Sequence, residues 1–420
     1  MRSRGFLLRL AVKNLTRYGR RTVITALAIA AGVGIYIAMD SAIAGFAGES
    51  DRLYAGYETG DVAVTAPGYW EERRRFPLDT LVADPEAVLE TLRADGIPAT
   101  PRTAFSGELV VRYDPFPEDG SLQAMFYGID TERDADVFGL LGSVEEGRVP
   151  DAGEEGLLIG RALADRLGAE VGFPVTVTTR TRDGFHQLID LEITGIFETP
   201  NPVINRRAMY MPIGLVDTVL EMRGAVTHVH AALPGSTPAD ADHGRVERLL
   251  ADHDEIDVLS FEVMNQEMAE IMEIEDSALQ IILILLGIIA AVGISNTMLM
   301  AVLEREREIG MMRAIGVRNS EIRRLFAYEA GAIGLGGSIA GVVVGTLLVW
   351  LLVNVGVDYG FLLDGVDMDF RWDGVLVGVW NVPTMGYAAV GAVFVAGLAS
   401  MVPVRRMLKK TVTATLRDDH

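Results

Sequence analysis

The sequence predicts a membrane protein in two parts: an α-helical membrane domain of four transmembrane helices and a large α+β extracytoplasmic domain. Three observations predict this. Four apolar stretches each reach the roughly 20 residues that a helix needs to cross a bilayer. A polar segment of roughly 230 residues separates the first stretch from the second. Basic residues gather in short segments, whereas acidic residues dominate the long one. The predicted transmembrane helices cover residues 22–47, 278–303, 330–353 and 384–404.

The start of the chain predicts a retained membrane anchor. In residues 1–21, apolar and basic side chains alternate at helical intervals, as in an amphipathic helix on the inner leaflet. Arg20-Arg21 before an apolar run is also the pattern of a twin-arginine export signal. The apolar core of a signal spans roughly 7–15 residues, which is shorter than 22–47. Asp40, near the outer end of this span, is interpreted as a solvated or hydrogen-bonded boundary residue rather than an ion site.

The charge distribution predicts the orientation, because basic residues in short flanking segments stay in the cytoplasm. Residues 1–21, the loop 304–326 and the tail 405–420 together hold 18 of the 37 basic residues. We therefore expect both termini to be cytoplasmic in a multi-pass protein of the cell membrane. Residues 48–277 carry 18 arginines, no lysine and 45 acidic residues, a net charge of −27. That segment and the loop 354–383 are expected to be extracytoplasmic.

Composition excludes several classes of function. The net charge of −21 argues against binding of nucleic acid, whose phosphates repel an acidic surface. The chain has no cysteine, so disulfides and thiolate metal sites are excluded. An acidic, lysine-poor exterior is typical of a halophile-like protein, since high salt screens the self-repulsion.

The pattern of the extracytoplasmic segment predicts two units of strand, helix and strand with an insertion between them. In the first unit, Asp84 and Pro85 mark the start of a helix over 85–94. The second unit leads through a helix that opens at Thr237-Pro238 to a last strand, and we expect the two units to share one sheet. Residues from about 142 to 211 are rich in strand patterns and in Gly and Pro, which predicts an inserted β-rich subdomain. The expected strands of the two units are 61–66, 100–113, 227–233 and 255–261.

The helical pattern resumes at Glu262 and has no Gly or Pro until Gly287, so we expect the external helix to continue into the second span. At its inner end lies the sequence EREREIGMMRAIGVRNSEI, residues 304–322. Arg305 and Glu308, like Glu304 and Arg307, are spaced to pair on a helix surface. Gly310 and Gly316 allow a bend or close packing, and Asn319 or Ser320 is expected to cap a second short helix before the third span. An ordinary positive-inside loop is the alternative interpretation.

These residues carry a resemblance: the loop is similar to the cytoplasmic signature of FtsX-like and MacB-type permeases of ABC transporters. The external segment resembles the MacB-like core domain of the same family. Other matching features run along the chain: Lys13-Asn14-Leu15 through Arg21-Thr22, Glu146-Gly147-Arg148, Gly160, Leu167-Gly168, Gly195-Ile196-Phe197, Glu329, Pro403, Arg405, Arg406 and 413–417.

The resemblance implies a dimer of permease subunits, homo- or heterodimeric, each docking a cytoplasmic ABC ATPase that binds ATP and Mg²⁺. This chain lacks the Gly-Lys pair of a P-loop, so we expect no cofactor on it and ATPase activity on a separate partner chain. The expected ATPase-coupling residues are Glu304, Arg305, Glu308, Gly310, Arg313, Gly316, Asn319 and Arg323.

Gly337, Gly341 and Gly345 line one face of the third span and predict close helix contact, within one subunit or between two. Asn296 is expected to bond between helices. The search for catalytic or metal sites predicts none. His228 and His230 lie on one side of a strand without a clear third ligand. The acidic run Asp130, Glu132, Asp134 and Asp136 lacks the rest of a calcium loop, and is expected to be a solvated turn.

The predicted function is that of a non-catalytic permease subunit, which couples ATP hydrolysis by its partner to movement of the extracytoplasmic domain. Its cargo is expected to be a lipophilic or peptidic substrate, exported or extracted at the outer surface. Two alternatives remain. One is an FtsX-like regulator that moves an external partner or accessory protein without transport. The other is a membrane-tethered receptor or scaffold that needs no ATP.

Overall fold

The computed structural model describes residues 19–233, 235, 242–253, 255–358 and 375–409. The chain divides into two compact units, each described here by itself. Among the described residues, the helical unit comprises 19–46, 272–358 and 375–409, and the α/β unit comprises those between Ala47 and Ile271. Parts of three predictions fall outside the described residues: the amphipathic helix before residue 19, most of the loop 354–383, and the tail beyond residue 409.

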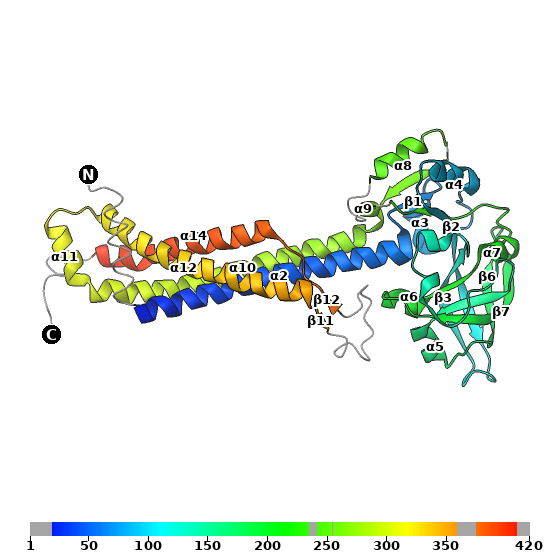
Figure 1. The fold of residues 1–420 in the computed structure, drawn as a ribbon, viewed down its shortest axis with the longest axis horizontal. Helices are drawn as coiled ribbons and strands as arrows, with labels where there is room; N and C mark the ends of the chain where they lie inside the picture. Colours follow the sequence, from blue (N-terminus) through cyan, green and yellow to red (C-terminus); the bar gives the residue numbers. More distant parts are fainter. Residues whose placement is uncertain (1–18, 234, 236–241, 254, 359–374, 410–420) are drawn as a thin grey trace. The chain divides into compact units, whose positions relative to one another are not determined.

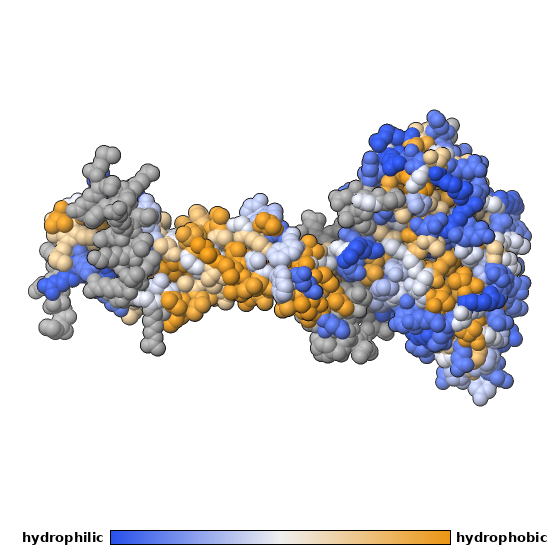
Figure 2. Space-filling model, viewed as in Figure 1, coloured by the Kyte–Doolittle hydropathy of each residue, from blue (hydrophilic) through white to orange (hydrophobic). Residues whose placement is uncertain are grey.

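In the part of the chain that the structure describes, four helices are long and apolar enough to cross a membrane (Figure 1). They are α2 (Gly19–Tyr54), α10 (Gln266–Glu304), α12 (Asn319–Asn354) and α14 (Val382–Leu408). Each is longer than the span predicted from the sequence, because polar turns extend its apolar stretch. Figure 2 shows apolar side chains exposed along these helices, as expected for surfaces that face lipid. The short strands β11 (Val357–Asp358) and β12 (Val375–Leu376) pair between α12 and α14.

The glycine face of α12 packs against α2 within the same chain. A Cβ added to Gly337, Gly341 or Gly345 would lie 2.7–2.9 Å from a side-chain atom of α2. The α2 residues that they meet are Ile29, Val33 and Ile37, which recur at the same interval of four. Because these three positions of α12 have no side chain, the two backbones approach closely. The close approach provides van der Waals packing, which stabilises helix pairs in lipid, where no hydrophobic effect acts.

Replacing Gly341 with valine should destabilise this helix pair by about 1–3 kcal/mol. The new Cβ would lie 2.7 Å from Val33 Cβ and 2.8 Å from the Ala30 carbonyl oxygen, and the backbone carbonyl has little freedom to move. Gly336→Val on the same helix is the matched control, because a Cβ there meets nothing within 4 Å. Thermal unfolding in detergent would measure the difference, and equal midpoints for the two variants would contradict the close packing.

Two details of the helices differ from the sequence prediction. The external helix is interrupted: α9 (Phe261–Met264) ends at Asn265, and only from Gln266 does α10 continue through the second span. The prediction of a second short helix before the third span is also wrong, since α12 runs unbroken from Asn319. The separate short helix is instead α11 (Glu306–Ala314), which follows α10 directly.

The two predicted strand-helix-strand units do share one sheet. Its order begins β10-β1-β9-β2, so each unit places a strand between the two strands of the other. The helices α4 and α8 supply apolar side chains such as Leu92 and Val246 to the core of this half. The Asp84 side chain accepts a hydrogen bond from Ala87 N at 3.1 Å and caps α4 as predicted. The bounds are β1 (Val62–Thr65), α4 (Pro85–Ala94), β2 (Ala99–Val111), β9 (His228–Ala231), α8 (His243–Leu249) and β10 (Asp257–Ser260). Thr237-Pro238 lie outside the described residues, and Asp242 caps α8.

The remaining strands close into a ring. Pairing runs β2-β3-β8-β5-β7-β6 and returns to β2, with β4 beyond β7. The strands of 142–211 are therefore part of the common sheet, and they form the barrel only together with β2 and β3. Phe105, Phe126, Leu157, Val177 and Met209 belong to its buried core. The strand bounds are β3 (Gly120–Ile129), β4 (Val144–Gly147), β5 (Gly156–Gly160), β6 (Pro174–Arg180), β7 (His186–Phe197) and β8 (Ala208–Pro212).

Short helices connect these strands. After α2 the chain forms one π-helical segment, η1 (Ala55–Thr59), before Gly60 turns it into β1. The others are α3 (Tyr69–Glu72), η2 (Arg73–Arg75), η3 (Asp134–Asp136), η4 (Leu141–Ser143), α5 (Arg161–Leu167), α6 (Pro202–Arg207) and α7 (Ile213–Leu220).

Candidate functional site

The first candidate site is the turn between α10 and α12 in the helical unit. The helix α10 ends where Arg305 leaves helical geometry (φ −113°, ψ 17°), and α11 begins at the next residue. Gly316 has φ +88°, a conformation that glycine adopts without strain, and it turns the chain toward α12. The Glu321 side chain accepts a hydrogen bond from Arg318 N at 3.0 Å. Arg318 therefore occupies the N-cap position of α12, where Asn319 or Ser320 was predicted.

A buried ion pair fixes this turn. Arg305 Nη1 lies 3.2 Å from Glu329 Oε2 on α12, and the two side chains are only 7% and 6% exposed. Arg305 Nε also lies 3.1 Å from Glu308 Oε2, which confirms the predicted i,i+3 pair. The guanidinium sits 5.5 Å from the centre of the Phe326 ring. Arg305 thus joins the end of α10, the start of α11 and the body of α12.

The outer side of α11 is exposed and partly apolar. Met311 is 52% and Ile315 73% exposed, and they are one helical turn apart. On the opposite side Ile309 and Gly310 are buried, together with Ile322 of α12. An exposed apolar pair on a helix that is held from behind has the geometry of a docking surface rather than of a flexible loop.

The predicted coupling residues separate into two groups. Glu304, Gly316 and Asn319 are exposed, and Glu308, Arg313 and Arg323 are half-buried, so all six reach the surface. Arg305 and Gly310 are buried inside the turn. Met311 and Ile315 were not predicted to be parts of the site, and Glu329 was named only as a feature shared with the family. The signal for Glu329 was its charge at the edge of an apolar span.

The second candidate site lies in the α/β unit, where α2 ends in η1. Four consecutive residues of η1 each bond to a different part of the unit. Gly56 O accepts from Gly139 N at 3.1 Å, and Tyr57 O accepts from Arg102 Nη1 at 3.3 Å. Asn201 Nδ2 donates to Glu58 Oε1 at 2.8 Å. His230 Nδ1 donates to Thr59 O at 2.7 Å. Backbone carbonyls at a helix end lack partners within the helix, and here the surrounding domain supplies donors.

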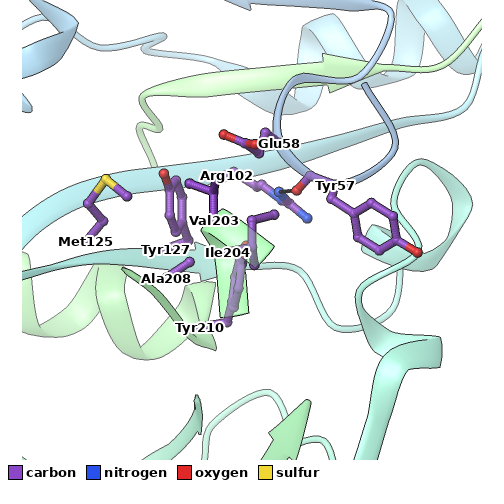
Figure 3. Close-up of a pocket in the computed structure, with 9 residues that line it drawn as sticks. All are labelled: Tyr57, Glu58, Arg102, Met125, Tyr127, Val203, Ile204, Ala208 and Tyr210. Atoms are coloured by element: carbon purple, nitrogen blue, oxygen red, sulfur yellow. Dashed lines mark hydrogen bonds between the residues drawn. The ribbon is translucent and has the colours of Figure 1, made fainter. Parts of the chain in front are cut away.

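Arg102 is the central residue of this second site (Figure 3). Its Nε and Nη2 donate to the two carboxylate oxygens of Asp134, both at 2.8 Å, and both side chains are buried. The guanidinium carbon lies 3.4 Å from the centre of the Phe138 ring. A bidentate, buried pair of this kind holds its partners in one geometry. Beside it lies a cavity of about 10 Å³, lined in part by Glu58, Arg102 and Tyr210, which has room for one water molecule.

His228 and His230 stack in the same core, with ring centres 5.1 Å apart. The Thr227 hydroxyl donates to Arg102 O, so His228 Nδ1 donates to that hydroxyl at 2.8 Å. Burial, and then the charge of Arg102, lower the pKa of His228 to about 3. Burial, followed by His228 and Arg102, also lowers the pKa of His230 well below its usual value. Both rings are therefore neutral in the folded protein, and each donates from Nδ1.

The stability of the α/β unit should consequently fall as pH decreases below about 6.5. Each histidine binds a proton on unfolding but not in the folded state, so the free energy of unfolding falls by about 1.4 kcal/mol per pH unit per histidine below the unfolded pKa. For His228 this loss continues toward its folded pKa of about 3. Thermal unfolding from pH 7 to pH 4.5 would measure it. His228→Phe should show a shallower pH dependence than the parent, and an unchanged dependence would contradict the buried neutral state.

The structure also revises the acidic run. Asp134 is fully buried against Arg102, so the prediction of a solvated turn is wrong for this residue. Asp130 instead closes the turn by accepting from the backbone nitrogens of Glu132 and Arg133. Among the residues that the structure describes, no three His, Asp or Glu side chains are grouped to hold a metal ion.

Two other polar residues inside the spans were singled out. Asp40 Oδ1 lies 3.4 Å from the Thr384 hydroxyl of α14, so this carboxylate takes part in a hydrogen bond between helices, as the sequence interpretation allowed. Near Asn296, the Ser295 hydroxyl donates to Ala399 O at 2.8 Å, and the Thr25 and Thr297 hydroxyls lie 3.0 Å apart. Polar contacts thus link α10 to both α2 and α14.

Comparison with known families covers both units. A model described as the MacB-like periplasmic core domain matches residues 22–248, more than half of the chain. A model described as the FtsX-like permease C-terminal matches residues 280–412. The chain belongs to the ABC transporter permeases of the FtsX-like and MacB type, which confirms the predicted family and fold class.

Individual relatives agree with this assignment. The chain is 30% identical over 222 residues to the lipoprotein-releasing system transmembrane protein LolC of Neisseria meningitidis serogroup B, covering 49% of each chain. It is 24% identical over 349 residues to the macrolide export ATP-binding/permease protein MacB of Neisseria gonorrhoeae, covering 80% of this chain and 51% of that one. The chain thus spans about half the length of these relatives. The crystal structure of the periplasmic region of MacB from Actinobacillus actinomycetemcomitans aligns with 51% of this chain and 94% of its own, at 16% identity and a TM-score of 0.36.

Proposed function

We propose that this chain is the membrane subunit of an ABC transporter that couples ATP hydrolysis by a separate cytoplasmic ATPase to movement of its α/β unit. In this proposal the turn around α11 and both termini are cytoplasmic, and the α/β unit is extracytoplasmic. The transporter exports, or extracts from the outer surface of the membrane, a lipophilic or peptidic substrate. Family membership supports the class of protein, and the charge distribution supports the orientation.

The single observation that carries the proposal is the exposed face of α11 backed by the buried Arg305–Glu329 pair. A docking surface that transmits movement needs apolar contact area on its outer side and a firm attachment on its inner side. Met311 and Ile315 supply the contact area, and Arg305 supplies the attachment to α10 and α12. The half-buried Arg313 adds a charge that can pair with an acidic group of the ATPase.

A second feature favours movement of the α/β unit over conduction through a pore. The helices α2 and α10 both continue from the helical unit into the α/β unit. Within the α/β unit the end of α2 is bonded to the two residues that directly precede α10: Asn265 Nδ2 donates to Asp51 Oδ1 at 2.7 Å, and the Tyr54 hydroxyl donates to Met264 O at 3.2 Å. Displacement of either helix would therefore be carried to the other at this point.

Purification of the intact protein from its native membrane tests the proposal. We expect an ATPase to co-purify with the parent chain, and Ile315→Glu or Arg313→Glu to reduce its recovery about tenfold, since a buried charge at an interface costs more than 1.4 kcal/mol. Phe185→Glu is the matched control, because Phe185 is an equally exposed apolar residue of the α/β unit, at 70%.

The outcomes separate the candidate functions. Recovery of an ATPase that responds to the α11 variants but not to the control supports the coupling role. ATP-dependent movement of a labelled lipid or peptide in vesicles then identifies a transporter, and ATPase coupling without such movement identifies a regulator of an external partner. An undisturbed complex after Ile315→Glu would reject α11 as the docking surface, and the absence of any ATPase would favour a receptor or scaffold.

A further inference from the structure

The end of α2 carries an arrangement that the family assignment does not explain. The helix changes to π-helical geometry over five residues, and Gly60 N bonds to Ala55 O at 2.9 Å. π-Helical turns are rare and are frequently found at functional sites. Only Gly60 and Asp61 separate this turn from β1, the strand that lies between β9 and β10. A helix thus leads almost directly into the middle of one half of the sheet.

We propose that η1 is the coupling element through which α2 moves the sheet of the α/β unit, with Arg102, Asn201 and His230 as its positioning residues. This inference rests on the function proposed above. Its basis is that four consecutive η1 residues are each held by a different element. The donors come from the η3–η4 connection, from β2, from the residue that caps α6, and from β9.

The contacts are suited to transmitting displacement rather than to closing a helix end. A simple cap satisfies carbonyls with water or with the next turn of chain, whereas here the donors lie between 45 and 171 residues away in sequence. The donors are themselves fixed: Arg102 by Asp134, and His230 by stacking on His228. Asn201 also caps α6 by accepting from Val203 N at 3.1 Å. A shift of η1 along its axis would therefore displace β2, β9 and α6 together.

The two residues that connect η1 to β1 are held in place by contacts with neighbouring strands. Gly60 has φ +69°, and a Cβ there would lie 2.8 Å from Ala231 O of β9. Asp61 Oδ2 accepts from Leu233 N at 2.7 Å, immediately beyond β9. Both residues that follow η1 are thus in contact with β9 or its extension. Movement of η1 cannot be absorbed by this two-residue connection and passes to the strands.

Hydrogen exchange on the complete complex tests this role. The chain, with its co-purifying ATPase in lipid nanodiscs, is compared without nucleotide and after trapping with ATP and vanadate. In the parent we expect trapping to change amide exchange in β1, β9 and the η3–η4 connection. The double variant Glu58→Ala, His230→Phe removes two of the four contacts while keeping the ring stack and the Asn201 cap. We expect the nucleotide-dependent change in the sheet to decrease about fivefold or more, the scale of a typical coupling free energy, while the ATPase rate stays within about twofold.

The control is Glu154→Ala, which breaks the exposed Arg148–Glu154 ion pair of the same unit without touching η1. The single variants Glu58→Ala and His230→Phe are measured in parallel. If the double variant fails to fold, the nucleotide response of each single variant still tests the role of η1. A nucleotide response in the variants equal to that of the parent overturns the role of η1. Absence of any response in the parent instead overturns the proposed function, so the two failures are distinguishable.

Discussion

Replacing Asp134 with alanine should destabilise the α/β unit by about 3–5 kcal/mol, because it leaves a buried arginine without its carboxylate. Arg102 and Asp134 are bonded through two pairs of atoms at 2.8 Å, and both are almost fully buried. Chemical or thermal unfolding of the purified protein would measure the loss. Such a cost is a large part of the total stability of a typical domain.

Two comparisons make this result specific. Glu154→Ala removes a carboxylate from an arginine that is 58% exposed and should change the stability little, because water screens an exposed pair. The double variant Arg102→Met, Asp134→Leu removes both charges, and should recover much of the loss because an apolar pair needs no partner. If Asp134→Ala cost no more than Glu154→Ala, the buried pair would not stabilise the core.

In the helical unit the largest effect should come from Glu329→Ala. Loss of this carboxylate leaves Arg305 buried between α10, α11 and α12, and we expect a destabilisation of about 3 kcal/mol or more. We also expect α11 to become mobile, because Arg305 no longer ties it to α12. The unfolding midpoint in detergent would report the first effect, and hydrogen exchange over residues 306–314 the second.

The matched control for Glu329→Ala is removal of the other carboxylate that pairs with Arg305. Its other partner, Glu308, is 44% exposed, and Glu308→Ala should cost less than about 1 kcal/mol. Exchange of the charges in Arg305→Glu, Glu329→Arg should restore part of the stability lost in either single variant. Equal effects of Glu329→Ala and Glu308→Ala would show that burial of the pair does not determine the strength of the turn.

Much of the architecture was predictable, because its signals are local. The spans follow from apolar length, and the start of α4 follows from Asp84 and Pro85. The contact between α2 and α12 could also be predicted in part from the sequence. Ile29, Val33 and Ile37 recur every four residues, as do Gly337, Gly341 and Gly345, so the two faces are complementary in the sequence itself. What local patterns could not give is which pairs of faces meet in one subunit.

The candidate sites were less predictable, because each depends on residues far apart in the chain. Arg102 and Asp134 lie 32 residues apart, and Asp134 stands in an acidic run that resembles a solvated turn. Arg305 has a suitable partner three residues on, so nothing in the local sequence points to Glu329, 24 residues away. The closure of the barrel through β6 and β2 likewise depends on tertiary pairing alone. The π-helical turn has no residue pattern of its own.

The place of β1 in the sheet bears on how the protein is made. β1 is synthesised early, yet both of its neighbours, β9 and β10, lie more than 160 residues later in the chain. Until the ribosome has delivered residue 231, this hydrophobic strand has neither of its neighbours to pair with, and contacts of such long sequence separation form slowly. A nascent chain that stalls before then would present an open, aggregation-prone strand, so quality-control proteases should recognise truncated products ending between β2 and β9 more readily than the full-length chain.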